Sequence, residues 1–254
     1  MISSFKITLT YLYADVIMKT KGVTKMFGNK MKAVTFSYDD GVTQDKRLIE
    51  IFDRYGLKCT FNLNSERLGL DGSLDREGVI VSHNKVKPCE VAEIYKNHEV
   101  AVHSLTHPTL TQLEDAEIIR QVEQDRINLS KLCGYEVVGM AYPNGPNDDR
   151  VAKIIRENTG VKYARTVTST YNFEPQENLY RFNPTVYHHR EFGKMTELAK
   201  EFIELKPDSP KIFYIWGHAY EFDIHNTWDE FEEFCKLISG HDDIFYGTNT
   251  QVLL

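Results

Sequence analysis

From position 31 onward, short runs of β-branched and aromatic residues alternate with longer amphipathic stretches. The short runs predict strands at 33–38, 58–63, 99–103, 137–142, 162–165, 211–216 and 244–246. The longer stretches predict helices at 44–55, 88–97, 113–132, 149–157, 192–205 and 228–238. This regular β/α alternation indicates an α/β fold, and at this length we expect a distorted (β/α) barrel of about seven parallel strands in a single domain.

One polar stretch, 65–87, interrupts the alternation, and we interpret it as a functional loop. The amino terminus is a second irregular segment. Residues 2–18 are mostly apolar or small, but Lys6 and Asp15 interrupt them, and they lack a cleavage site. They are also too short and too polar for a membrane span. We therefore expect an N-terminal extension at 1–30, a domain at 31–254 and a cytoplasmic protein.

Composition narrows the possible functions. A chain of 254 residues with 41% hydrophobic content can build one full core. The formal net charge of −7, without a Lys/Arg cluster longer than a pair, makes nucleic acid an unexpected partner. The cysteines are widely separated, which predicts buried free thiols: Cys59, Cys89, Cys133 and Cys235. The pattern gives no indication of the oligomeric state.

Two adjacent carboxylates, Asp39 and Asp40, end the first predicted strand, and Gly41 follows them. Such a pair repels itself unless a cation or a shared proton offsets the repulsion. An isolated Asp-Asp-Gly also fits a strand-to-helix turn in which one carboxylate caps the helix, and such turns are common. The pair is therefore a candidate site only in combination with other residues.

Two histidines, His103 and His107, follow the third predicted strand. Their four-residue spacing brings both imidazoles to one side of a helical turn or tight loop, and Pro108 disfavours a long helix there. With Asp40 they make a three-ligand set that leaves a position for water, as catalytic zinc requires. A histidine pair alone also fits a hydrogen-bonded turn.

Two further strand ends carry weaker signals. The segment Tyr142, Pro143, Asn144, Gly145 forms an exposed turn whose amides could point at a developing oxyanion, although a plain loop fits equally. Trp216 and His218 end a late strand, and histidine is suited to protonating a leaving group near neutral pH. The aromatic residues near these ends could stack on sugars, but core packing is their commoner use: Tyr38, Tyr142, Trp216, Tyr220 and Trp228.

In this order, the clusters [Ser/Thr]-[Phe/Tyr]-Asp-Asp-Gly, His-Ser-x-x-His, a Pro-x-Gly turn and a late strand-end His resemble the polysaccharide deacetylases, carbohydrate esterase family 4 with its NodB-like homology domain. The resemblance covers about 32–246. It implies that Asp39 is the general base, that Asp40, His103 and His107 bind a divalent cation, most simply Zn²⁺, and that His218 is the general acid.

The same resemblance implies that the turn around Asn144 lends a backbone amide to the oxyanion. The chain departs from the family at Ala141, where an arginine usually packs beside the base. Arg165 ends the next strand and is our candidate to supply that charge, a surface arginine being the alternative.

The function predicted in this way is a metal-dependent hydrolase that removes acetyl groups from an N-acetylated or O-acetylated carbohydrate. Two alternatives remain at this stage. The same site would attack a non-sugar amide or imide, since fold does not fix function. Ala141 is also compatible with a catalytically inactive carbohydrate-binding relative, whereas Asp39 and His218 argue against one.

Overall fold

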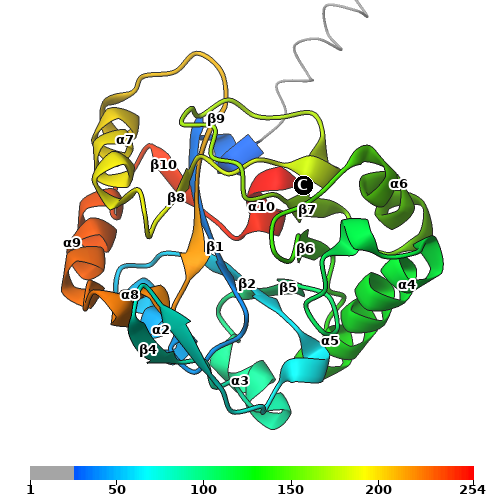
Figure 1. Ribbon diagram of the computed structural model, residues 1–254. Coiled ribbons are helices and arrows are strands. Elements are labelled where there is room, and N and C mark those ends of the chain that lie inside the picture. Colours follow the sequence, from blue (N-terminus) through cyan, green and yellow to red (C-terminus); the bar gives the residue numbers. More distant parts are fainter. Residues whose placement is uncertain (1–25) are drawn as a thin grey trace, which may run out of the picture.

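An eight-stranded parallel sheet forms the centre of the computed structural model, which describes residues 26–254 (Figure 1). Its strands are β1 (Lys32–Asp39), β2 (Cys59–Leu63), β5 (Glu99–Val102), β6 (Gly139–Ala141), β7 (Tyr163–Arg165), β8 (Val186–Tyr187), β9 (Lys211–His218) and β10 (Ile244–Tyr246). They pair in the order β7-β6-β5-β2-β1-β9-β8, and β10 pairs with the start of β1. All seven predicted strands are present, and the predicted α/β fold is confirmed.

The sheet curls into a distorted barrel that the segment 182–188 closes. Phe182 donates its backbone N–H to Ala164 on β7, 2.9 Å away, and accepts one from Thr166. Six residues later, His188 donates its N–H to Trp216 on β9, also at 2.9 Å. The segment, which contains β8, therefore hydrogen-bonds to β7 at its start and to β9 along the rest.

Most helices lie around the outside of the sheet (Figure 1). They are α2 (Asp45–Arg54), α3 (Val91–Ile94), α4 (Asp115–Ile119), α5 (Asp125–Cys133), α6 (Asp149–Asn158), α7 (Phe192–Glu204), α8 (Glu221–Ile224), α9 (Trp228–Ile238) and α10 (Asn249–Leu253). In α2, the buried side chains Leu48, Ile51 and Phe52 follow the three- and four-residue spacing of one helical face. That face packs on the sheet in the larger hydrophobic cluster.

The barrel interior is more polar than the layer outside it, and the carboxyl-terminal helix α10 lies at its amino-terminal end. Asn249 accepts a hydrogen bond from Thr35 on β1 at 2.8 Å, and Thr250 donates its N–H to Glu99 at 2.9 Å. Val252 belongs to a small apolar cluster with Ala33 and Ile212. This helix was not predicted, because five residues are too few for a periodic signal.

Three further elements differ from the sequence-based expectations. The predicted helix 113–132 is interrupted by the π-helical turn η5 (Arg120–Gln124). The polar stretch 65–87 contains an antiparallel hairpin, β3 (Ser73–Arg76) and β4 (Val79–Ser82). The predicted helix 88–97 is shorter, as η3 (Pro88–Glu90) followed by α3.

We predicted an N-terminal extension at 1–30. Its residues 1–25 lie outside the part of the chain that the structure describes. Its last residues contact the domain: Phe27 stacks on Phe245, and Lys30 donates to the carbonyl of Ile244 at 2.9 Å. All four cysteines are free, as predicted. The prediction of burial is confirmed for Cys59 and Cys235, but it is wrong for Cys89, which is exposed on η3, and Cys133 is only partly buried. No helix within 26–254 has the length and apolar character needed to cross a membrane.

Candidate active site

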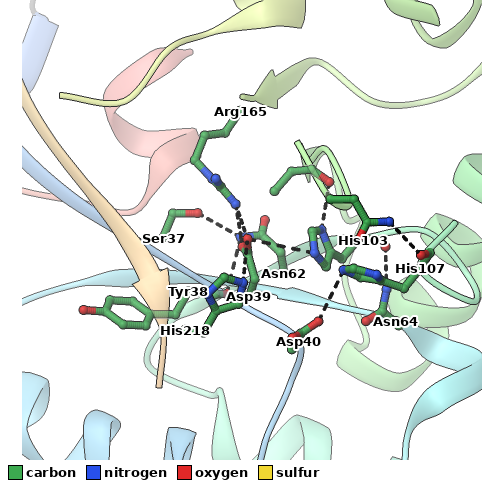
Figure 2. A network of polar contacts seen from close by, with 12 residues as sticks. Ser37, Tyr38, Asp39, Asp40, Asn62, Asn64, His103, His107, Arg165 and His218 are labelled. Carbon is green, nitrogen blue, oxygen red and sulfur yellow. Dashed lines mark hydrogen bonds and ion pairs between the residues drawn. The ribbon is translucent and has the colours of Figure 1, made fainter. Parts of the chain in front are cut away.

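The residues predicted to act as base, acid and metal ligands lie together at the carboxyl ends of the strands (Figure 2). Asp39 ends β1, Arg165 ends β7, and His218 ends β9, while His103 follows the last residue of β5. In a parallel barrel all these ends lie on one face. The site is therefore a direct product of strand length and register.

Asp39 is almost fully buried, at 2% exposure, and four side chains have a nitrogen atom within 4.0 Å of its carboxylate: Arg165, Asn62, His103 and His218. The Arg165 guanidinium donates to it at 2.6 Å, and the Asn62 amide donates to the same oxygen at 2.8 Å. Burial alone raises the pKa of Asp39, but the positive charges of Arg165, His103 and His218 outweigh burial and lower it. The carboxylate is therefore ionised and held in one orientation.

Asp40, His103 and His107 form a group whose ligand atoms all lie within 4.8 Å of one another. The Nε2 atom of His107 lies 3.6 Å from Oδ1 of Asp40. Two ligands that are each about 2.1 Å from a tetrahedral zinc ion are about 3.4 Å apart. The spacing of this pair therefore suits one small cation, with little movement of either side chain.

The loop that carries the two histidines is tight and not helical, which decides between the two conformations left open by their spacing. Ser104 and His107 both adopt positive φ, at 63° and 66°. Gln121, in the π-helical turn, accepts a hydrogen bond from the N–H of Leu105 at 3.0 Å through its backbone carbonyl. π-Helical turns are frequent at functional sites, and this one anchors the loop.

His103 is fixed by its other ring nitrogen. Nδ1 lies 2.9 Å from the carbonyl oxygen of Ala141, so as a donor it leaves Nε2 free to bind a cation. Burial lowers the pKa of His103, and burial together with the charge of His103 lowers the pKa of His107 to about 4. Both rings are therefore neutral at pH 7, the form that binds metal.

His218 has the opposite electrostatic character. Its Nδ1 lies 3.0 Å from Oε1 of Glu221, and its Nε2 lies 4.0 Å from Oδ2 of Asp39. Burial alone lowers the pKa of His218, but the charge and hydrogen bond of Glu221, followed by the charges of Asp40 and Asp39, raise it to about 9. The imidazolium form therefore predominates at neutral pH, and its Nε2 faces Asp39.

Glu221 is itself held by a buried hydrogen-bonded chain. Its Oε2 lies 2.8 Å from Nε2 of His188, whose Nδ1 lies 2.8 Å from the Tyr38 hydroxyl. Gly217 leaves room for the His188 ring, since a Cβ there would lie only 2.6 Å from it. Glu221 is 5% exposed and contacts His218.

Two residues of the polar stretch 65–87 contact Asp40 and were not anticipated. Nε2 of His83 lies 3.0 Å from Oδ2 of Asp40, and the Lys85 ammonium donates to the Asp40 carbonyl at 2.8 Å. Burial alone raises the pKa of Asp40, but His83 and Lys85 outweigh it and lower that pKa well below its usual range. Nothing in their sequence context marked them, because the contact depends on how the stretch folds back.

The predicted substrate-binding residues divide into two groups. The turn of Pro143, Asn144 and Gly145 lies beside the loop that carries His103 and His107. There, Nδ2 of Asn144 donates to the His107 carbonyl at 3.3 Å. Tyr142 is 1% exposed, and its hydroxyl donates to the Tyr180 carbonyl at 2.8 Å. Trp216 is 7% exposed, and the Arg165 guanidinium lies over its ring.

The strand-end aromatics are therefore buried: Tyr38, Tyr142, Trp216, Tyr220 and Trp228 are between 0% and 7% exposed. Core packing, the commoner of the two uses weighed for them, accounts for these side chains.

Comparison with known families identifies the group of proteins to which this arrangement belongs. The family model described as polysaccharide deacetylase matches residues 28–164, more than half of the chain. The chain belongs to the polysaccharide deacetylase family. The family resemblance is thereby confirmed. Three of the four sequence clusters lie in the matched region, and the one that ends at His218 lies beyond it. The matched region contains Asp39, Asp40, His103 and His107 and ends one residue before Arg165. No protein among the curated sequences matches the chain.

Solved structures of deacetylase-family proteins share the fold over most of the chain. A family 4 carbohydrate esterase from Streptomyces lividans, in complex with acetate, is 14% identical and has a TM-score of 0.54, covering 86% of this chain and 92% of its own. A family 4 acetyl xylan esterase from Clostridium thermocellum, with a cobalt ion, is 14% identical at a TM-score of 0.55, covering 87% and 90%.

A family 4 pseudoenzyme from Bacillus anthracis is 18% identical at a TM-score of 0.50, covering 89% of this chain and 66% of its own. At these identities the likeness establishes the fold alone, and both esterases and a pseudoenzyme share it. The activity has to be argued from the side chains.

Proposed function

We propose that the protein is a divalent-metal-dependent deacetylase that hydrolyses the acetyl group of an N-acetylated carbohydrate. One observation carries the proposal: an ionised Asp39 borders the three-ligand group of Asp40, His103 and His107, and a protonated His218 lies 4.0 Å from Asp39. A base, an acid and a cation position on one face are the parts that amide hydrolysis by an activated water requires.

The ligand group fits a cation by its chemistry as well as its spacing. Two neutral imidazoles and one carboxylate are the donors of many catalytic zinc sites, which keep a further position open. Zn²⁺ is accordingly our candidate, although these donors also bind other first-row cations. A cation there would polarise the acetyl carbonyl and lower the pKa of a bound water from about 15.7 toward about 7.

Asp39 is the proposed general base. Its Oδ2 lies 3.9 Å from Nε2 of His103, so the carboxylate borders the cation position without belonging to the ligand group. Arg165 and Asn62 leave it charged and restrict its rotation. A carboxylate held in this way accepts the proton of the attacking water.

His218 is the proposed general acid. Its Nδ1 is bound to Glu221, and its Nε2, 4.0 Å from Oδ2 of Asp39, is the nitrogen left to carry the transferable proton. It is therefore oriented to protonate the departing amine. The turn at Asn144, beside the His107 carbonyl, is the proposed source of a backbone N–H for the oxyanion.

Family membership supports a carbohydrate substrate. The presence of acetate in one structurally similar esterase and of cobalt in another supports acetyl chemistry at a metal. Amide hydrolysis follows the family description, whereas the acetyl xylan esterase makes ester hydrolysis the natural comparison in an assay.

The test combines metal analysis with acetate release from acetylated glucosamine oligomers and acetylated xylan. The protein should bind one cation at this group and release acetate from the oligomers, and loss of activity on chelation should be reversed by Zn²⁺. Metal without acetate release would favour a non-sugar amide or imide, and neither metal nor acetate release would favour an inactive carbohydrate-binding relative.

Two variants separate the roles of the adjacent aspartates. Asp39→Asn should retain the cation and lose turnover by a factor of about 10² to 10⁴, the usual contribution of a general base. Asp40→Asn should lose both the cation and turnover. Equal loss of cation in both variants would refute the assignment.

A further inference from the structure

A second group of metal-binding side chains lies at the rim of the barrel, outside the active site. Glu77 occupies the turn of the β3–β4 hairpin, His189 follows β8, and His225 follows α8. The ligand atoms of the three residues all lie within 4.8 Å of one another. None of the proposed catalytic steps uses them.

The two imidazoles approach one carboxylate from the same side. Nε2 of His225 lies 2.9 Å from Oε2 of Glu77, and Nε2 of His189 lies 3.6 Å from Oε1. The two rings are parallel, with an interplanar angle of 1° and centroids 5.6 Å apart. These nitrogen–oxygen distances bracket the separation of about 3.4 Å expected between two ligands of one tetrahedral zinc ion.

We infer that Glu77, His189 and His225 bind a second divalent transition-metal cation of the Zn²⁺ class. The donor set, two imidazoles and a carboxylate, is the same as in the active site, and Zn²⁺ accepts such donors readily. Partial exposure of Glu77 and His225, at 45% and 53%, leaves water free to complete the coordination.

An ordinary ion pair explains only part of this geometry. The contact between His225 and Glu77 is a good hydrogen bond at 2.9 Å, but that between His189 and Glu77, at 3.6 Å, is too long for one. A single cation between the three residues would satisfy both contacts. Zn²⁺ would replace the proton on Nε2 of His225, which is then released to solvent.

A neighbouring group with metal-binding residue types does not qualify. His188, His189 and Glu221 also lie close together, but both nitrogens of His188 are engaged, one by Tyr38 and one by Glu221. Glu221 in turn binds His218. Only the outer group therefore has donors that a cation could take without dismantling the hydrogen bonds of the active site.

The position of this group gives the cation a mechanical consequence. β4 lies beside α8, and the chain that leaves β4 runs within one residue to His83 and then to Lys85, both of which contact Asp40 (Figure 1). A cation at Glu77 would fasten the hairpin to two other segments of the rim. It would thereby limit the motion of the segment that contacts Asp40 through His83 and Lys85.

The test is zinc stoichiometry on the full chain after removal of metal with a chelator, measured by equilibrium dialysis and elemental analysis. The unaltered protein should bind two Zn²⁺ per chain, and His189→Ala and His225→Ala should each bind one. His241→Ala, which alters a partly buried histidine outside both groups, is the matched control and should bind two. Asp40→Ala should also bind one, at the outer group.

Limited trypsin digestion provides a second readout, because Arg76 is exposed and immediately precedes Glu77. Zn²⁺ should slow cleavage after Arg76 by about tenfold or more in the unaltered protein and in Asp40→Ala, since a cation that fastens the hairpin suppresses its local opening. It should have no effect on cleavage in His189→Ala. No bound Zn²⁺ in Asp40→Ala, or a second Zn²⁺ that persists in a His189→Ala/His225→Ala double variant, would overturn the inference.

Discussion

Replacing Glu221 with glutamine should move the alkaline limit of activity to lower pH. Glu221 is the main group that raises the pKa of His218 from its ordinary value of 6.5 to about 9, against the effect of burial. Glutamine keeps the size of the side chain and removes its charge. The pKa of His218 should then fall to about 6.5 or below. His218 therefore loses its proton, and with it the ability to act as an acid, at lower pH.

The expected effect follows from the protonated fraction of His218. At pH 8 this fraction falls from about 0.9, for a pKa of about 9, to about 0.03, for a pKa of about 6.5, which predicts about a 30-fold loss of turnover. At pH 6 both forms are mostly protonated, and the loss should be less than about twofold. The sign is fixed: the acid must hold its proton, so a lower pKa removes activity from the alkaline side.

The assay is the pH profile of kcat for acetate release. Asp223→Asn, in the same helix but bound to Gln44 and Trp228, is the matched control and should leave the alkaline limit in place. General structural damage from losing the contact between Glu221 and His188 would lower activity at all pH values alike. An alkaline limit that does not move in Glu221→Gln would refute the assignment of His218 as the acid.

Two further substitutions test how charge is balanced around the aspartates. Arg165→Ala should leave the buried Asp39 carboxylate without its main cationic partner and lower the free energy of unfolding by about 3 to 5 kcal/mol, measured by urea denaturation at pH 7. The rate of acetate release should fall while zinc stays bound. An unchanged rate would remove Arg165 from the mechanism. Lys85→Met removes a positive charge 3.7 Å from Oδ1 of Asp40, so zinc should bind several-fold more tightly in a chelator competition. Weaker zinc binding would instead mean that Lys85 mainly holds Asp40 in place.

The residues at strand ends could be predicted because their position depends on a local pattern. A short β-rich run followed by a chemical residue identifies a strand end, and parallel strands place their ends on one face. That reasoning locates Asp39, Asp40, His103 and His218 without any knowledge of which strands are neighbours. Arg165 needed only the additional expectation that its strand lies next to the one ending at Ala141.

The supporting residues could not be predicted, because their surroundings come from distant segments. His188 follows a two-residue strand that has no periodicity to detect. The position of Glu221 depends on the four-residue helix α8 and on its contact with His218. The position of His83 depends on how the preceding hairpin folds back toward Asp40. An isolated glutamate or lysine in a polar stretch is usually solvated, and only the folded chain shows that Glu221 and Lys85 are buried.

The two adjacent aspartates differ because each has its own positive partner. Ala141 and Arg165 are paired on β6 and β7, so an arginine one strand further away reaches Asp39 from a position level with Ala141. The absence of an arginine at position 141 therefore does not leave the base without a counter-charge. Asp40 faces His107 through Oδ1 and His83 through Oδ2. Because one carboxylate is neutralised by a fixed guanidinium and the other is turned toward imidazoles, the pair has the arrangement that the proposed roles of base and metal ligand require.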